Sequence, residues 1–154
     1  MNIFLPYPNN IPLSVRSLDD KRLNKQILET FQILQVSKGL SEGYKNHPII
    51  KHYIKFPKFL NSYGYLCCEE YKYRFNKTHK LSNKFNLYST PWYIPFYVAG
   101  SINTPECIRT TDNVGELYKQ KLIDKWESDK FKGRPSKWTN RDIPNFYSEF
   151  CISK

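Results

Sequence analysis

Residues 18–34 read LDDKRLNKQILETFQIL, a stretch with the periodicity of an amphipathic helix. At about 100° per residue, its apolar side chains gather on one side. They are Leu23, Ile27, Phe31 and Leu34, with Leu28 beside them. Ser17 followed by Asp20 has the pattern of an S-x-x-D capping box, and Gly39 follows the last apolar residue. We therefore expect a helix over residues 18–38.

The opposite side of this helix carries basic and amide side chains and a single carboxylate, Glu29. On helix geometry alone, Glu29 is a surface charge paired with Lys25 one turn earlier, an interaction worth a few tenths of a kcal/mol. The alternative is that Glu29 is the working acid of a site. Helix geometry favours the surface interpretation, so the decision depends on the rest of the chain.

Proline positions predict further helices. Asn46-His47-Pro48 resembles an N-cap followed by proline at the first helical position, which begins a short helix. Pro57 starts a longer helix that ends near Phe75, with an apolar stripe made of Phe59, Leu60, Tyr63, Leu66, Cys67 and Tyr71. Asp112 can cap another helix, whose spaced apolar residues are Val114, Leu117, Tyr118, Leu122 and Trp126.

The segments between these helices are rich in proline. We expect a non-helical loop over residues 6–12, an apolar segment packed over the helices at 89–100, and a basic loop at 132–144 that leads into a last short turn. No repeat, domain boundary or convincing strand pattern is present. The fold class expected is all-α, with residues 1–154 forming one compact domain of four to five helices.

The composition favours a globular protein with a polyanionic partner. Hydrophobic residues make up 40% of the 154 residues, which excludes a disordered chain. Twenty-four Lys and Arg against 14 Asp and Glu give a formal net charge of +10, so nucleic acid is the first partner to consider and an acidic membrane surface the second. Abundant Asn, Lys, Tyr, Phe and Ile are also typical of an AT-rich genome, which accounts for part of this charge.

Targeting and redox features indicate an intracellular protein. The N-terminus MNIFLPYPNN has no charged leader, and no run approaches the roughly 20 apolar residues of a membrane span, so we expect a soluble protein. Adjacent Cys67 and Cys68 lie in a helical pattern and are expected to be buried free thiols. The expected localisation is cytoplasmic, or the nucleus or a viral factory for a virus of eukaryotes.

No motif for metal or cofactor binding is present. The chain has no Walker loop, no G-x-G-x-x-G, no H-E-x-x-H, no G-x-S-x-G and no Cys/His cluster at zinc spacing, so we expect no metal and no cofactor. The three histidines are scattered. His47, before a proline, is more typical of a partial cap or packing residue than of a catalytic base.

Basic residues alternate with aromatic residues in three segments: KHYIKFPK (51–58), YKYRFNKTHK (71–80) and KFKGRPSKWTNR (130–141). Phosphates attract the cations, and unstacked bases pack on flat side chains. Solvated helix faces have a similar composition, so these segments favour nucleic-acid binding without requiring it.

Several stretches taken in order resemble the pyrimidine-dimer DNA glycosylases of the endonuclease V type and their broader relatives. They are FLPYP (4–8), LDDKRLNKQILETFQIL (18–34) and GYKNHPIIKHYIKFPKFLNSYGYLCCEEYKYR (43–74). The eleven-residue spacing from Leu18 to Glu29 is similar to that between a leucine and a helix glutamate in the family, and an N-H-P segment follows in both. The resemblance covers residues 1–80.

The resemblance implies an all-α, metal-free DNA glycosylase, with or without a strand-nicking lyase step. It assigns the nucleophile to the N-terminal α-amine, here that of Met1 because Asn2 is too large for removal of the methionine. Glu29 matches the helix glutamate that assists at the sugar, and Arg22 matches a basic residue on the same helix face. The residues expected to contact DNA are Lys21, Lys25, Asn46, His47, Lys51, Lys55, Lys58, Arg74, Lys137, Trp138 and Arg141.

The expected partner is duplex DNA with a pyrimidine dimer, another damaged or modified base, or an abasic site, bound by a monomer. Two alternatives remain open at the level of sequence. One is a non-catalytic nucleic-acid-binding protein on the same scaffold, in which Glu29 only orients Arg22. The other is an interaction or inhibitor protein whose basic surface is incidental.

Overall fold

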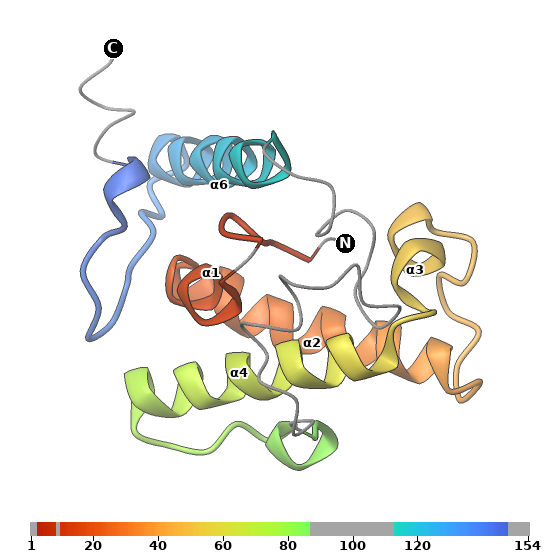
Figure 1. Ribbon diagram of the computed structural model, residues 1–154. Helices are drawn as coiled ribbons and strands as arrows, with labels where there is room; N and C mark the ends of the chain where they lie inside the picture. The colour runs from red at the N-terminus through yellow and green to blue at the C-terminus, as the bar shows by residue number, and fades with distance from the viewer. Residues whose placement is uncertain (1–2, 9, 87–112, 148–154) are drawn as a thin grey trace.

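The computed structural model describes residues 3–8, 10–86 and 113–147, and within these ranges the fold is all-α (Figure 1). Its elements are α1 (Ile11–Arg16), α2 (Asp20–Ser37), α3 (Pro48–Tyr53), α4 (Pro57–Phe75), the 3₁₀ helix η1 (Ser82–Lys84) and α6 (Asn113–Phe131). No strand occurs in this part of the chain, which confirms the predicted fold class. The expected packing of residues 89–100 and the cap at Asp112 lie outside the described residues.

Helix α2 begins two residues later than predicted and has a different cap. The N-cap is Asp19, whose side chain accepts the backbone N–H of Arg22 at 2.9 Å. The predicted capping box at Ser17 is therefore wrong. Ser17 instead ends α1, and its hydroxyl donates to the carbonyl of Leu13 at 2.8 Å. Asp19 caps α2 because it directly precedes the first helical residue, and its carboxylate reaches the free N–H of the third helical residue, Arg22.

Helix α1 is an element that the sequence prediction missed. Asn10 caps it by accepting the N–H of Leu13 at 3.1 Å, and Pro12 lies in its first turn, where its missing N–H costs nothing. The prediction of a non-helical loop over residues 6–12 is thus wrong at its C-terminal end. Asn10 and Pro12 together are the start signal that identifies this helix.

The helices α3 and α4 begin where their prolines predict. In α3, His47 is the N-cap, and its Nδ1 accepts the N–H of Ile49 at 3.2 Å. Helix α4 ends at Asn76, whose φ of 53° lies in the left-handed region that commonly terminates helices. Cys67 and Cys68 on α4 are buried free thiols, as expected.

The core forms where α2 packs along α4, with α3 and η1 at their flanks. Leu23, Ile27 and Leu34 of the predicted stripe are buried, whereas Phe31 is half-buried and Leu28 is exposed at the rim. On α6, Leu122 and Trp126 are buried, as predicted from their spacing. Leu117 is 62% exposed, because it lies on the face of α6 that points away from the core.

The N-terminal segment, residues 3–8, lies between α6 and the pair formed by α2 and α4 (Figure 1). Phe4 packs edge-on against Tyr118 of α6, with ring centroids 6.0 Å apart. From the other side, the hydroxyl of Tyr63 on α4 donates to the carbonyl of Phe4 at 2.9 Å. The segment is therefore a buried layer that brings the start of the chain into the middle of the molecule. None of the described helices has an apolar stretch that could cross a bilayer.

Candidate functional site

Three residues on the polar side of α2 are buried. Arg22, Gln26 and Glu29 have only 8%, 1% and 8% of their surface exposed. The N-terminal segment and α6 cover them, two elements distant from α2 in sequence. Buried charged groups are rare in proteins unless they are paired or functional. This side of α2 is therefore the first place to look for a site.

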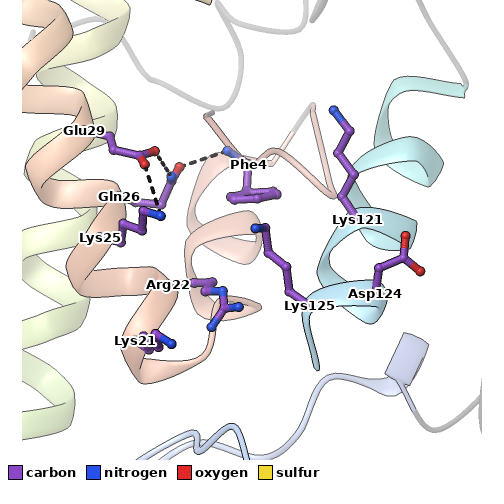
Figure 2. A pocket seen from close by; sticks show the side chains of 9 residues that line it. All are labelled: Phe4, Lys21, Arg22, Lys25, Gln26, Glu29, Lys121, Asp124 and Lys125. Atoms are coloured by element: carbon purple, nitrogen blue, oxygen red, sulfur yellow. Dashed lines mark hydrogen bonds and ion pairs between the residues drawn. The ribbon is translucent and has the colours of Figure 1, made fainter. Parts of the chain in front are cut away.

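A hollow of about 470 Å³ opens between this side of α2 and α6 (Figure 2). We call it the cationic hollow. Its lining residues are Phe4, Lys21, Arg22, Lys25, Gln26, Glu29, Lys121, Asp124 and Lys125. Five of these side chains are basic and two are acidic, so the hollow carries a local excess of positive charge. A polyanion is the ligand class that such a lining favours.

Gln26 connects the N-terminal segment to Glu29. Its Oε1 accepts two donors, the N–H of Phe4 at 2.9 Å and the hydroxyl of Tyr63 at 2.8 Å. These two bonds define the orientation of the amide, so Nε2 points to Glu29 and donates to its Oε2 at 3.2 Å (Figure 2). Burial keeps the pKa of the Tyr63 phenol well above its ordinary value, so the phenol stays a donor. One amide, that of Gln26, therefore binds both the backbone of Phe4 and the carboxylate of Glu29.

Glu29 is not a solvated surface charge. The pair with Lys25 predicted from helix spacing is present, with 3.8 Å between Nζ and Oε1, but the two side chains differ in environment. The side chain of Lys25 is 60% exposed, whereas that of Glu29 is 10% exposed and is also bound by Gln26. Glu29 is therefore a buried carboxylate at the edge of the hollow, paired with an exposed lysine.

Arg22 links α2 to α6 through Asp129, with 2.7 Å between NH1 and Oδ2. Burial by itself would raise the pKa of Asp129, but the hydrogen bond and charge of Arg22 outweigh it and lower the pKa below its ordinary value. Arg22 therefore lines the hollow while its guanidinium is engaged by a carboxylate. Arg22 and Glu29 both line the hollow, and a catalytic role for Arg22 stays a prediction.

Two lysines of α6 belong to the hollow and were missed from the sequence. Lys121 and Lys125 are four residues apart and hence on one face of the helix, and Lys125 extends toward α2 (Figure 2). Partial burial lowers the pKa of the Lys125 ammonium, and the charges of Arg22 and Lys25 lower it further. The signal in the sequence was their spacing, but nothing in the sequence shows that α6 faces α2.

Three residues predicted to contact DNA are bonded to other parts of the protein. Arg74 is buried, and its guanidinium is bound to Glu70 and Asp20 at 3.0 Å each and to the carbonyl of Arg16. Arg141 forms a two-pronged bond with Glu70 at 2.8 and 3.0 Å. Trp138 is buried, and its indole N–H donates to the carbonyl of Ser17.

These contacts fasten the basic loop, residues 132–144, to the ends of α1, α2 and α4. Arg74, Trp138 and Arg141 therefore have structural roles, and their contact with DNA stays a prediction. Buried arginines are stable only when paired, and Glu70 with Asp20 supplies that pairing. The alternation of basic and aromatic residues in the sequence does not show which of these residues are buried.

The remaining predicted residues are scattered. Lys21 and Lys25 line the cationic hollow, and His47 lies with Glu29 at a second, smaller hollow. The exposed residues Asn46, Lys51, Lys55, Lys58 and Lys137 line neither of these hollows. Their contact with DNA stays a prediction. Met1 lies outside the described residues.

Comparison with protein families supports the resemblance inferred from sequence. The family model described as pyrimidine dimer DNA glycosylase matches residues 1–83, which is more than half of the chain and includes α1 to α4 with Gln26 and Glu29. No curated protein and no solved structure matches the chain significantly. Membership of such a family implies a DNA substrate and a role in DNA repair. The chain belongs to the pyrimidine dimer DNA glycosylase family.

Proposed function

We propose that this protein excises a damaged base from duplex DNA and then nicks the strand through an imine formed by the N-terminal amine of Met1. Pyrimidine dimers are the first substrate to test, followed by other damaged or modified pyrimidines. The observation that carries the proposal is Glu29, a buried carboxylate at the edge of a cationic hollow and hydrogen-bonded to the residue that anchors the N-terminal segment.

Covalent reach is compatible with this assignment. Phe4 is anchored to Gln26, which also donates to Glu29, and Met1 stands three residues before Phe4. Three residues span at most about 11 Å. The pKa of an α-amine is near 8 against about 10.4 for lysine, so about a tenth of it is neutral at pH 7, compared with well under a thousandth of a lysine.

The chemistry assigns one task to each group. The neutral amine attacks the anomeric carbon of the sugar, and the base departs with the electron pair of the glycosidic bond. Ring opening then leaves an imine between the sugar and the chain. Glu29, as a carboxylate, stabilises positive charge at the anomeric carbon and then removes the neighbouring proton, so that the 3′ phosphate leaves by elimination. The lysines of the cationic hollow neutralise the phosphates on either side.

Borohydride trapping tests the imine directly. We expect a covalent adduct with abasic duplex DNA, and cleavage of one glycosidic bond in a duplex that contains a pyrimidine dimer. This cleavage is measured as a strand break after alkali, because the freed base stays joined to its neighbour in the dimer. An acetyl group or an extension on the N-terminus should abolish trapping while affinity stays within a few-fold. Trapping that survives a blocked N-terminus would transfer the nucleophile to a lysine, and Lys125 is the first to test because burial lowers its pKa. Binding without any adduct and without glycosidic-bond cleavage would favour the non-catalytic alternative.

A further inference from the structure

The reaction proposed above needs a proton that neither of its reacting groups supplies. When the glycosidic bond breaks, its electron pair goes to N1 of the pyrimidine and is shared with the neighbouring carbonyl oxygen, so the departing base becomes a strong proton acceptor. Glu29 acts as a carboxylate and has no proton to give, and the amine of Met1 reacts in its neutral form. A base leaves more easily when an acid donates to it in the transition state. The acid has to be a group that lines the cationic hollow beside Glu29.

Lys125 differs from the other basic residues that line the cationic hollow. It is half-buried, whereas the other three lysines of the hollow are exposed. Arg22 is buried as well, but a guanidinium does not release its proton in proteins. The side chain of Lys125 extends from α6 toward Phe4 and α2 (Figure 2). It is thus directed to the region where Glu29 and the start of the chain meet.

Among the residues that the structure describes, Lys125 has no ion-pair partner. The neighbouring carboxylates are taken, since Glu29 is paired with Lys25 and Asp129 with Arg22. Partial burial and these two cations lower the pKa of the Lys125 ammonium, against the two carboxylates, which raise it. A partly buried ammonium beside two cations gives up its proton more readily than an ordinary lysine does.

We propose that Lys125 is a catalytic acid that donates a proton to the pyrimidine as it leaves the sugar. This inference rests on the proposed function, because it assigns a proton donor to the glycosidic step. The bond between C1′ and N1 breaks, and the base keeps its electron pair and takes the proton. The amine of Met1 bonds to C1′, and the proton that its nitrogen then loses returns to the neutral amine of Lys125. Lys125 therefore ends the step protonated, and no further reactant is consumed.

The experiment compares two reactions of each variant at saturating protein, so that differences in affinity do not enter. One is glycosidic-bond cleavage in a duplex with a pyrimidine dimer, measured as a strand break after alkali. The other is borohydride trapping on abasic duplex DNA, from which no base has to leave. Lys125→Gln should cleave the dimer duplex about a hundredfold more slowly than the wild type, because the acid is lost. It should trap abasic DNA within a few-fold of the wild type.

Lys125→Arg separates the proton from the charge. Before the transfer Lys125 is a cation, so it also attracts the phosphates as the other lysines do. Arginine keeps this charge but does not release a proton, and Lys125→Arg should therefore cleave as slowly as Lys125→Gln. Lys121→Gln is the matched control, because Lys121 lies one turn earlier on α6 and lines the same hollow. Its two reactions should change by the same factor. Equal melting temperatures establish that all the variants are folded.

The outcomes separate this inference from the proposed function. Cleavage at the wild-type rate by Lys125→Gln or by Lys125→Arg would overturn the inference alone. An equal loss of cleavage and trapping in Lys125→Gln would also overturn it, because Lys125 would then act as the nucleophile or by placing the DNA. A wild-type protein that binds the dimer duplex but cleaves no glycosidic bond would overturn the proposed function, and this inference with it.

Discussion

Glu29 is the residue whose replacement is most informative. Glu29→Gln keeps the size of the side chain and an acceptor for Gln26 but removes the negative charge. We expect single-turnover cleavage of lesion-containing duplex to fall on the order of a hundredfold or more, because a positioned acid or base is lost. Stability should change by no more than about 1 kcal/mol.

DNA affinity of this variant should be unchanged or tighter, because a negative charge beside the phosphates is gone. Glu116→Gln is the control, since the side chain of Glu116 is 70% exposed, pairs with Lys119 and does not line the cationic hollow. Cleavage by Glu29→Gln at the wild-type rate would show that the buried carboxylate has no catalytic role.

Gln26 positions Glu29, and its loss should affect both stability and cleavage. Gln26→Leu leaves the N–H of Phe4 without its acceptor and removes one of the two acceptors of the Tyr63 hydroxyl. The expected cost is about 2 kcal/mol in the free energy of unfolding, with slower cleavage because Glu29 loses its donor. Denaturant unfolding and single-turnover cleavage measure the two effects.

Tyr63→Phe separates these effects. It removes the phenolic hydroxyl but leaves Gln26 bonded to Phe4 and Glu29. The free energy of unfolding should therefore fall by about 1 kcal/mol, and cleavage should stay within a few-fold of the wild type. If Gln26→Leu cleaved as fast as Tyr63→Phe, the amide would have no positioning role.

At the scale of elements, the contact between α4 and η1 depends on a glycine. A methyl group on Gly64 would overlap the ring of Phe85, which follows η1. Glycine to alanine in a helix normally stabilises by about 1 kcal/mol, but here we expect a loss of about 1–3 kcal/mol from overpacking. Thermal unfolding measures the sign. Gly43→Ala, with only the Ser41 hydroxyl near the added methyl, should be close to neutral. A Gly64→Ala variant with raised stability would mean that Phe85 can move aside.

His79 joins the loop after α4 to α2 and should make stability depend on pH. Its Nδ1 accepts the N–H of Leu81, and its other ring nitrogen bonds the side chain of Asn24, both at 3.0 Å. Burial lowers the pKa of His79, with a contribution from Lys80. The pKa of His79 in the folded protein is below the unfolded value of about 6.5. The stabilisation is therefore complete above pH 6.5 and is lost as the pH falls from there through the folded pKa.

The measurement is the melting temperature between pH 7.5 and 5.5, for the wild type and for His79→Gln. The wild type should lose stability across this window, and the variant should lose less, because its amide does not titrate. Both proteins retain His47 and His52, so the difference isolates His79. Parallel curves would exclude a contribution from His79.

For the whole molecule, the net charge of +10 and the cationic hollow predict DNA binding that weakens steeply with salt. Five or more phosphate contacts give a slope of log K against log salt of roughly −0.9 per contact. A double variant, Lys121→Gln with Lys125→Gln, should reduce the slope by about 2. The control pair, Lys38→Gln with Lys84→Gln, changes two exposed lysines outside the cationic hollow and outside the three basic segments. A flat salt dependence would remove DNA as the partner.

Much of the fold can be predicted from sequence because its signals are local. Apolar spacing and proline at helix starts define α2, α3 and α4 to within about two residues. These signals involve residues within one or two turns of each other. The cap at Asp19 and the short helix α1 were missed because adjacent polar residues compete for the same N–H groups, and spacing does not rank them.

The candidate site divides in the same way. Glu29 was singled out by its spacing from Leu18, a feature of the sequence, yet its burial depends on the N-terminal segment and α6. Lys121 and Lys125 became part of the hollow, and Arg74 and Trp138 part of the core, only through packing between distant segments. The sequence alone determined the helices and the chemical groups they carry. Tertiary structure decided which of those groups face each other, because long-range packing sets burial and pairing.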